Sequence, residues 1–264
     1  MAEARELALV TGASSGIGFE LAKLLAENGH DLVVVADGPG IHTAAAQLAT
    51  TGARVRPLQV DLRKPRDVER LYRHVSEQRK PLKVAALNAG TGRAGRFLDG
   101  DLQDDLDIVE LNVRSTVHLA KLVLRGMVDQ GTGGVLFTSS IVAMMPGSYQ
   151  SVYNASKSFV QSFAEALHDE LRDTDVTVTA LMPGPTDTNF FRRSAMLDTV
   201  LGRLPGKDDP AEVARQGFDA LMRGRRKVVA ESATSKLIGV ASRVLPDSVK
   251  ATANRLIARP VGRQ

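Results

Sequence analysis

The sequence predicts a single doubly wound α/β domain over residues 1–264, with a parallel seven-stranded sheet and helices on both of its faces. Short apolar runs rich in β-branched residues alternate along the chain with longer segments of helical periodicity, a pattern typical of this class. No internal repeat, low-complexity tract or linker interrupts the alternation. Because this length suffices for one large core, we expect one domain.

The first half of the chain contains four apolar runs that predict strands at 7–10, 31–36, 54–60 and 83–87. Helical periodicity between these runs predicts helices at 17–28, 42–51 and 66–78. Gly29 and Gly52 end the first two helices, and Pro65 precedes the third, which are favoured places for these residues.

The second half contains three further apolar runs, which predict strands at 135–139, 176–182 and 227–230. One or two helices are predicted over 101–130, and the second part of this segment is apolar almost all round. It should therefore be buried on more than one side. A helix with a single apolar stripe is predicted at 153–171.

The composition excludes several kinds of function. No apolar run approaches the roughly 18 residues of a membrane span, and no secretory signal precedes the first strand. The chain has no cysteine, so a cytoplasmic location is the default expectation. The basic run 223–227 lacks aromatic neighbours and a nucleic-acid motif, and the five histidines lack metal-ligand spacing. We therefore expect neither a nucleic-acid partner nor a metal.

A glycine-rich turn, Thr11-Gly-Ala-Ser-Ser-Gly-Ile-Gly18, follows the first predicted strand. Its three glycines allow a tight turn and a close approach of the backbone to a pyrophosphate group. The helix that begins here would offer free N–H groups and its positive dipole end to that anion. The turn therefore predicts a phosphate site.

The same turn also satisfies Gly-x-Ser-x-Gly, the nucleophile elbow of α/β-hydrolases, through Gly12, Ser14 and Gly16. That fold takes an oxyanion donor from an earlier strand–helix loop, and no such loop precedes residue 11. The last histidine that would complete a triad, His168, lies within an amphipathic helical pattern. We therefore exclude a hydrolase.

Tyr153 and Lys157 stand four positions apart in a predicted helix, so they share one helical face. A free tyrosine has a pKa of about 10, which is too high for a general base near neutrality. A cation about 5 Å away, at an effective dielectric of about 20, would lower the phenol pKa by roughly two units. Taken alone, the pair is better interpreted as a surface pair at the start of a helix; the alternative is that Lys157 tunes Tyr153 into a usable acid or base, and the rest of the chain decides between them.

Seven motifs occur in an order and at spacings that are typical of one family. They are the glycine turn, Asp61 after the third strand, Asn88-Ala-Gly90 after the fourth, Asn112, Ser140, Tyr153 with Lys157, and Pro183-Gly184. Over about residues 6–190 the sequence therefore resembles the short-chain dehydrogenase/reductase family. The resemblance implies a Rossmann-type fold, an NAD or NADP cofactor, and hydride transfer to or from a carbonyl or alcohol carbon.

The resemblance also implies a catalytic set of Asn112, Ser140, Tyr153 and Lys157. Tyr153 would be the general acid or base, and Lys157 would also hydrogen-bond the nicotinamide ribose. Ser140 would bind the substrate oxygen, a contact that strengthens as charge develops there, and Asn112 would hold a water that links Lys157 to solvent. Ser139 is expected to be structural, because the spacing of thirteen residues before Tyr153 selects Ser140.

The cofactor is expected to contact the glycine turn, the ends of the next strands and the segment that follows Pro183. The expected residues are Gly12, Ser14, Ser15, Gly16, Ile17, Gly18, Asp37, Asp61, Leu62, Asn88, Ala89, Gly90, Tyr153, Lys157, Pro183, Gly184, Thr186 and Thr188. By resemblance, Asp61 would meet the adenine edge, and Asn88 and Gly90 would fix a turn beneath the cofactor.

The end of the second predicted strand favours NAD over NADP. A carboxylate at this point binds the ribose hydroxyls of NAD and repels the 2′-phosphate of NADP, whereas an arginine binds that phosphate. Ala36 occupies the usual acidic position and Asp37 the next one, nineteen residues after Gly18, where relatives of the NADP type carry arginine. Ser15 stands where such relatives place a basic residue. Two alternatives stay open: Asp37 only caps its Asp-Gly turn, or a base such as Arg63 binds the phosphate.

We expect a medium-sized, apolar alcohol or ketone as the substrate. The segment 188–206, which includes Phe190, is rich in apolar residues and corresponds to a mobile substrate lid in relatives. With Met145 it would line an adaptable apolar pocket around Ser140 and Tyr153. The alternative is that these apolar residues only pack against the sheet.

We expect a homodimer, with a tetramer as the alternative. The helix through 117–127 is apolar beyond one face, and in relatives this helix and the Tyr153 helix pair with their copies. A helix-like C-terminal extension at 232–264 departs from the family pattern and puts its common tetramer in doubt. Leu87, where relatives often carry a second asparagine, is a smaller departure.

A second hypothesis keeps the fold without the catalysis, as a dinucleotide-sensing regulator or scaffold. Such proteins usually lack the tyrosine or the lysine, whereas Asn112, Ser140, Tyr153 and Lys157 are all present here. The sequence therefore favours an enzyme.

Overall fold

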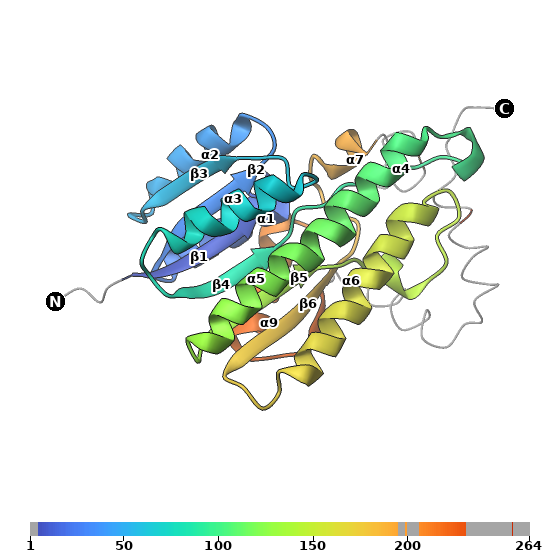
Figure 1. Cartoon of the computed structure of the whole chain (residues 1–264). Helices are drawn as coiled ribbons and strands as arrows, with labels where there is room; N and C mark the ends of the chain where they lie inside the picture. The colour runs from blue at the N-terminus through green and yellow to red at the C-terminus, as the bar shows by residue number, and fades with distance from the viewer. Residues whose placement is uncertain (1–4, 195–198, 200–205, 231–254, 256–264) are drawn as a thin grey trace.

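The computed structural model describes residues 5–194, 199, 206–230 and 255. Within them, seven strands form one parallel sheet in the order β3-β2-β1-β4-β5-β6-β7 (Figure 1). The strands are β1 (Glu6–Thr11), β2 (His30–Ala36), β3 (Val55–Gln59), β4 (Leu82–Leu87), β5 (Gly133–Thr138), β6 (Val176–Pro183) and β7 (Lys227–Ala230). The predicted doubly wound α/β class is confirmed.

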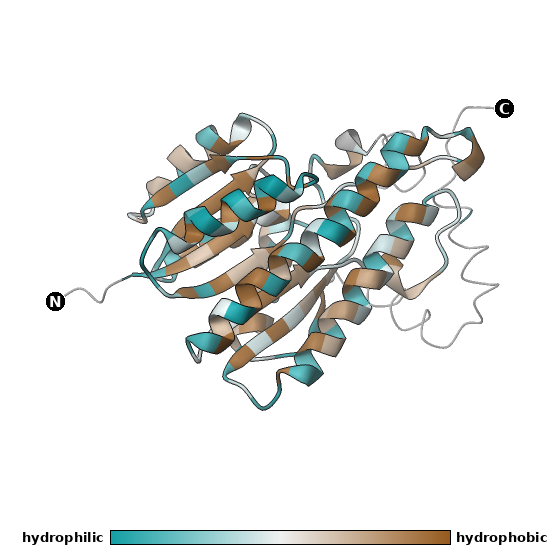
Figure 2. Cartoon of the chain, viewed as in Figure 1, coloured by the Kyte–Doolittle hydropathy of each residue, from teal (hydrophilic) through white to brown (hydrophobic). Residues whose placement is uncertain are grey.

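Among the described residues, three helices cover each face of the sheet. On one face lie α1 (Gly16–Glu27), α2 (Gly40–Ala49) and α9 (Pro210–Met222), and on the other lie α3 (Pro65–Ser76), α5 (Ser115–Asp129) and α6 (Ser151–Glu170). Figure 1 shows α3, α5 and α6 in front of the sheet, and Figure 2 shows apolar residues along the strands beneath them.

Side chains along a strand alternate between two cores, because successive residues of a strand point to opposite faces. Leu9 of β1 packs in the core beneath α3, α5 and α6, whereas Val10 packs in the core beneath α1, α2 and α9. All seven residues of β2 are buried, which explains why residues 32–36 form a continuous apolar run rather than an alternating one.

The segment predicted as one or two helices over 101–130 consists of two helices joined by a wider turn. Helix α4 (Leu102–Val109) runs into a π-helical turn (Glu110–Arg114), and α5 follows without a break. Short 3₁₀ turns cover Phe97–Asp99 and Ile141–Met144, and α7 (Phe190–Arg193) follows β6.

The sequence analysis missed α9, which connects β6 to β7. The signals for it were present, because Asp209 caps the helix by accepting a hydrogen bond from the N–H of Ala211 at 3.0 Å, and Pro210 fills the first helical position. Its buried stripe, which includes Val213 and Leu221, then packs beneath the sheet.

The strand order places a crevice at the carboxyl ends of β1 and β4. From β1 the chain proceeds outward to β2 and β3, and it then crosses back to β4 on the opposite side. In open α/β sheets, ligands bind at this reversal of strand order.

Two predicted regions fall largely outside the described residues. The extension predicted at 232–264 does so except for Arg255, and the lid predicted at 188–206 is described only over 188–194, at 199 and at 206. Among the helices that the structure does describe, none combines the length and the apolar character needed to cross a membrane.

Candidate active site

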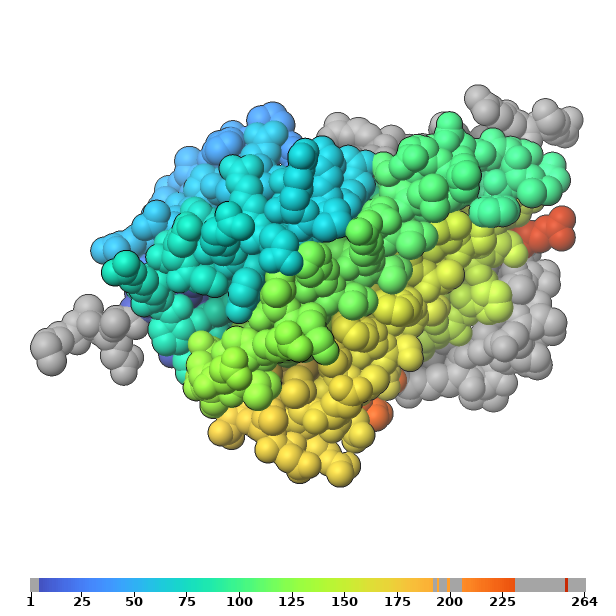
Figure 3. Space-filling view, viewed as in Figure 1, coloured from blue at the N-terminus to red at the C-terminus, as the bar shows by residue number. Residues whose placement is uncertain are grey.

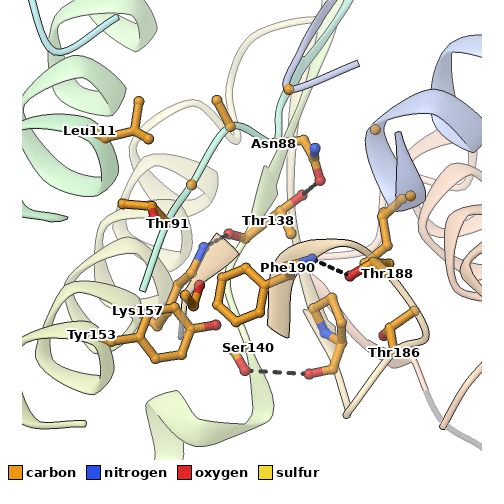
Figure 4. A pocket seen from close by; sticks show the side chains of 18 of the residues that line it. Asn88, Thr91, Leu111, Thr138, Ser140, Tyr153, Lys157, Thr186, Thr188 and Phe190 are labelled. Carbon is orange, nitrogen blue, oxygen red and sulfur yellow. Dashed lines mark hydrogen bonds between the residues drawn. The ribbon is translucent and has the colours of Figure 1, made fainter. Parts of the chain in front are cut away.

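A cavity of about 350 Å³ opens at the carboxyl ends of the central strands. Every residue predicted to bind cofactor or substrate lines it, from Gly12 in the glycine turn to Phe190 at the start of α7. Of the predicted site residues, only Asn112 does not line the cavity. Figure 4 shows that the labelled side chains converge from β4, β5, α6 and the segment after β6.

The glycine turn requires its glycines for two different reasons. Gly12 and Gly16 have φ values of +67° and +58°, a backbone region that side chains with a Cβ disfavour. A Cβ at Gly18 would lie 2.3 Å from the carbonyl oxygen of Gly12. The backbone of this turn therefore faces the cavity without side chains in the way, at the start of α1.

The Asn88 side chain joins the glycine turn to the centre of the sheet. Its Nδ2 donates to the carbonyl oxygen of Thr11 at 3.2 Å, and its Oδ1 accepts from the hydroxyl of Thr138 at 3.1 Å. The Thr11 hydroxyl in turn accepts hydrogen bonds from the backbone N–H groups of Asn88 and Ala89, both at 3.0 Å. The carboxyl ends of β1, β4 and β5 are thereby held in one arrangement.

Tyr153 and Lys157 lie on the inward face of α6, with exposed fractions of 9% and 5%. The Lys157 Nζ lies 5.9 Å from the centroid of the Tyr153 ring and donates to the carbonyl oxygen of Thr138 at 2.8 Å. The predicted proximity of the two side chains is therefore present, and β5 fixes the position of the ammonium group (Figure 4).

The expected lowering of the Tyr153 pKa by Lys157 is not what the protein alone produces. Burial raises the pKa of Tyr153 to about 12, and a hydrogen bond with Ser140 offsets only part of this rise. Burial also lowers the pKa of Lys157 to about 8. The sequence argument counted the attraction between phenolate and ammonium but omitted the cost of removing both charged groups from water.

Asn112 supports the site from behind. Its Oδ1 accepts from the backbone N–H of Thr91 at 2.9 Å, and its Nδ2 donates to the Thr91 carbonyl at 2.8 Å and to the Ser156 hydroxyl at 2.9 Å. The Ser156 hydroxyl donates onward to the carbonyl oxygen of Tyr153 at 2.7 Å. The π-helical turn that carries Asn112 thus connects the segment after β4 to α6. The role of Ser156 in this connection was not predicted from the sequence.

The two serines after β5 face different partners. Ser139 donates to the carbonyl oxygen of Lys157 at 2.9 Å, which ties β5 to α6. Ser140 contacts Tyr153, and its other hydrogen bonds, to the Pro183 carbonyl and from the Val142 N–H, are both long at 3.4 Å. The Ser140 hydroxyl is therefore the more available of the two for a ligand oxygen.

The segment after β6 crosses the cavity toward the glycine turn. The Thr188 methyl carbon would lie 2.8 Å from a Cβ on Gly16, so the two backbones approach closely. Thr188 accepts a hydrogen bond from the N–H of Phe190 at 3.2 Å, and the Phe190 ring lies 5.4 Å from the Tyr153 ring, centroid to centroid (Figure 4).

Gly92, which the sequence analysis missed, packs directly on these two aromatic rings. A Cβ at Gly92 would lie 2.8 Å from Cδ2 of Tyr153 and 3.0 Å from Cζ of Phe190. Only a glycine at position 92 leaves room for both rings. The sequence signal was its position two residues after Gly90, in the segment that follows β4.

Charged side chains gather at the opposite end of the cavity, near the end of β2. Arg63 donates to Asp61 from Nε at 2.9 Å and from Nη2 at 3.1 Å, and it also hydrogen-bonds Asp107. The hydrogen bond from Arg63 holds the pKa of the Asp61 carboxyl below its ordinary value. Asp37 lines the cavity at this end and is exposed.

The described residues contain no group of three or more metal-ligating His, Cys, Asp or Glu side chains.

Residues 6–196 match the sequence profile of the short chain dehydrogenases. The chain is 30% identical over 218 residues to the 3-oxoacyl-acyl-carrier-protein reductase of Vibrio cholerae, covering 79% of this chain and 86% of that protein. It superposes with a TM-score of 0.78 and 28% identity on a short-chain dehydrogenase from Sphingobium yanoikuyae in complex with NADPH, over 90% of this chain and 94% of that one. A short chain dehydrogenase/reductase from Burkholderia phymatum in complex with NAD shares the fold, with a TM-score of 0.85 at 22% identity over 100% of this chain and 99% of that one.

The strand order, the glycine turn and the Tyr153–Lys157 pair are those of a Rossmann-type oxidoreductase. The chain belongs to the short-chain dehydrogenase/reductase family. The family predicted from the seven sequence motifs is confirmed.

The buried Lys157 ammonium should cost stability at neutral pH. Its pKa is about 8 in the folded protein and 10.5 in a model peptide, so the unfolded chain holds the proton over a range where the folded protein has released it. The free energy of unfolding therefore rises as the pH increases from about 8 to about 10.5. Lys157→Met should raise the free energy of unfolding at pH 7 by on the order of 2 kcal/mol. Removing the buried charge should contribute about 3 kcal/mol, and losing the hydrogen bond should cost about 1 kcal/mol.

Chemical denaturation at pH 7 and at pH 10.5 measures this difference. The gain from Lys157→Met should disappear at the higher pH, and Lys23→Met, a change at an exposed lysine of α1, should have no effect at either pH. If Lys157→Met lowers the free energy of unfolding equally at both pH values, the buried ammonium does not destabilise the folded protein.

Proposed function

We propose that this protein is a nicotinamide-dependent oxidoreductase that interconverts a ketone and the corresponding alcohol. The observation that carries the proposal is the convergence of Ser140, Tyr153 and Lys157 in one cavity with the glycine turn. A dinucleotide-sensing role without catalysis would not require a buried phenol and a strained ammonium beside an available hydroxyl.

The cavity fits a dinucleotide at the glycine turn. Gly12, Gly16 and Gly18 expose backbone to the cavity, and the first turn of α1 carries no acidic side chain that would oppose a pyrophosphate. Pro183, Thr186 and Thr188 line the same cavity as the glycine turn and Tyr153. When bound there, the nicotinamide would supply or accept the hydride.

Tyr153 is suited to exchange a proton with the substrate oxygen. With a pKa of about 12 it is neutral at pH 7, so in the reducing direction it donates its proton to the oxygen as the carbonyl carbon receives the hydride. Ser140 donates a hydrogen bond to the same oxygen and lowers the cost of the charge that develops on it. Lys157, largely protonated at pH 7 with a pKa of about 8, stabilises the phenolate left on Tyr153.

Tyr153→Phe should lower kcat about 100- to 10,000-fold, because general acid catalysis typically contributes 10²–10⁴-fold. Binding of the reduced cofactor, followed by its fluorescence, should stay within about threefold of the wild-type value. The rate is measured with a panel of ketones that runs from sugars to cyclic and aromatic ketones. Tyr72→Phe, which changes a tyrosine on α3 outside the cavity, is the matched control and should be inert.

Wild-type turnover by the Tyr153→Phe variant would refute the mechanism. If the wild-type protein binds a reduced cofactor but turns over no member of the panel, the sensing role is favoured instead.

The substrate that the cavity fits best is a medium-sized apolar ketone or alcohol. Tyr153 lies in an apolar cluster with Phe190, Phe191, Val142 and Ala94, and Met145 lines the cavity near them. The relative from Vibrio cholerae is named as a reductase of a 3-oxoacyl group, which contains a ketone. A preference for small sugars or charged acids in the ketone panel would contradict this substrate class.

We favour NAD as the cofactor. Asp37 lines the cavity just after β2, where a carboxylate suits ribose hydroxyls and repels a 2′-phosphate. Arg63, the alternative phosphate ligand, is held by hydrogen bonds to Asp61 and Asp107, so its charge is already compensated. The proteins of similar structure include complexes with NADPH and with NAD, so the local charge is what supports this choice.

NADH should bind at least about tenfold more tightly than NADPH, because a 2′-phosphate next to an unpaired carboxylate costs more than about 1.4 kcal/mol. Fluorescence titration of the wild-type protein with both cofactors measures the ratio. Asp37→Arg should reverse the preference, whereas Asp219→Arg on the remote helix α9 should leave it unchanged. Tighter binding of NADPH by the wild-type protein would show that the choice is wrong.

We also propose that the protein forms a homodimer through the outer face of α4, α5 and α6. Leu102, Leu106 and Val109 of α4, Val117 of α5 and Phe159 of α6 are apolar and between 37% and 68% exposed. These helices lie side by side on the face shown in Figure 3. A second copy of the same face would bury this apolar surface.

The cytoplasmic location stays a prediction from the sequence.

Leu106→Glu should convert the dimer to a monomer, because it places a charge in the middle of the proposed interface. Light scattering at micromolar concentration should give twice the chain mass for the wild-type protein and the chain mass for the variant. Met222→Glu on α9 is the matched control, since Met222 is 48% exposed and Leu106 45%. A wild-type monomer, or equal effects of the two variants, would contradict this interface.

A further inference from the structure

One buried hydroxyl group in the cavity lacks a hydrogen-bond partner among the described residues. Ser194 follows α7, lines the cavity and is only 2% exposed. Its Oγ has no hydrogen-bond partner in the part of the chain that the structure describes. Buried side-chain hydroxyls are normally satisfied, and the exceptions often mark a functional site.

The backbone fixes where this hydroxyl lies. The N–H of Ser194 donates to the carbonyl oxygen of Phe190 at 2.9 Å, which extends α7 by one residue. Residues four apart share a helical face, so Ser194 lies on the side of α7 that carries Phe190. Phe190 contacts the Tyr153 ring, and Phe191 belongs to the same apolar cluster. Ser194 therefore lines the same cavity as Tyr153, on the face of α7 whose Phe190 ring contacts the Tyr153 ring.

A hydroxyl in this place does not serve packing. Phe190, Phe191 and Val142 around Tyr153 are apolar, and a buried hydroxyl among apolar groups loses its hydrogen bonds to water without replacing them. An alanine would fill nearly the same volume without that loss. A ligand that supplies a polar atom would satisfy this hydroxyl.

We propose that Ser194 binds an oxygen atom of the substrate that is remote from the reacting carbon. This inference rests on the proposed function, and it narrows the substrate class: the molecule is an apolar ketone or alcohol that carries a second hydroxyl or carbonyl group. The Ser194 hydroxyl both donates and accepts, so it binds either group. Ser140 and Tyr153 hold the oxygen that reacts, and Ser194 fixes the other end of the molecule.

Ketones that differ by one hydroxyl test the inference. The probes are 2-acetylnaphthalene and its hydroxy derivatives, which are isomers of one another with the hydroxyl group at successive positions of the second ring. For each hydroxy isomer, the ratio of its kcat/KM to that of the parent ketone is measured in wild type, Ser194→Ala and Ser76→Ala. Ser76 is an exposed serine of α3 that serves as the matched control.

For at least one isomer, Ser194→Ala should lower this ratio about tenfold, the effect of one lost hydrogen bond, while Ser76→Ala should leave it unchanged. Without ligand, the thermal midpoint of Ser194→Ala should equal or exceed that of the wild type, because an unsatisfied buried group has been removed.

Three results would overturn the inference. One is an unchanged ratio for every isomer, and another is a thermal midpoint lowered by Ser194→Ala, which would indicate a structural hydroxyl. The third is weaker binding of NADH and NADPH by Ser194→Ala without a ketone, which would assign the hydroxyl to the cofactor. If the wild type reduces no ketone, the proposed function fails separately; the thermal shifts that the same ketones cause in wild type and Ser194→Ala then decide the role of Ser194.

Discussion

The hydrogen bonds of Asn88 are the constraint on which the rest of the site depends. A single amide side chain holds the carbonyl of Thr11 at the end of β1 and the hydroxyl of Thr138 at the end of β5. Thr138 then fixes Lys157 through its carbonyl oxygen. Because β4, which leads into Asn88, lies between these two parallel strands and pairs with both, a displacement at the glycine turn would be transmitted to Tyr153 and Lys157. The glycine turn and the Tyr153–Lys157 pair are therefore coupled through one set of hydrogen bonds.

Burial, rather than the attraction between charges, dominates the chemistry of Tyr153 and Lys157. Both side chains lie deep in the protein, and each is driven toward its neutral form. The site thus keeps a phenol that retains its proton until a partner oxygen develops charge. Burial also makes the charged form of Lys157 unfavourable, so an anionic neighbour would stabilise its ammonium group.

The sequence determines the fold more directly than it determines the details of the site. Apolar runs such as that of β2 and glycine signals such as Gly29 depend on local physics, so the strands and most helices were predictable from them. Helix α9 was also marked locally, by Asp209 and Pro210, and was overlooked. By contrast, the contact of Gly92 with Tyr153 and the link from Asn112 through Ser156 join segments far apart in the chain. No periodicity records such contacts, and the Tyr153 pKa likewise depends on burial, which only the assembled fold defines.

The contact between Phe190 and Tyr153 also limits how this enzyme can change during evolution. Phe190 is the residue best placed to shape the apolar pocket, and its ring lies against Tyr153, which is proposed to transfer the proton. Gly92 has no side chain and therefore leaves room for both rings. A substitution at position 190 that admits a new substrate therefore also alters the packing and the solvation of the phenol. A substitution at position 190 should therefore change substrate selectivity and reaction rate together. A compensating substitution elsewhere will be needed before both can improve.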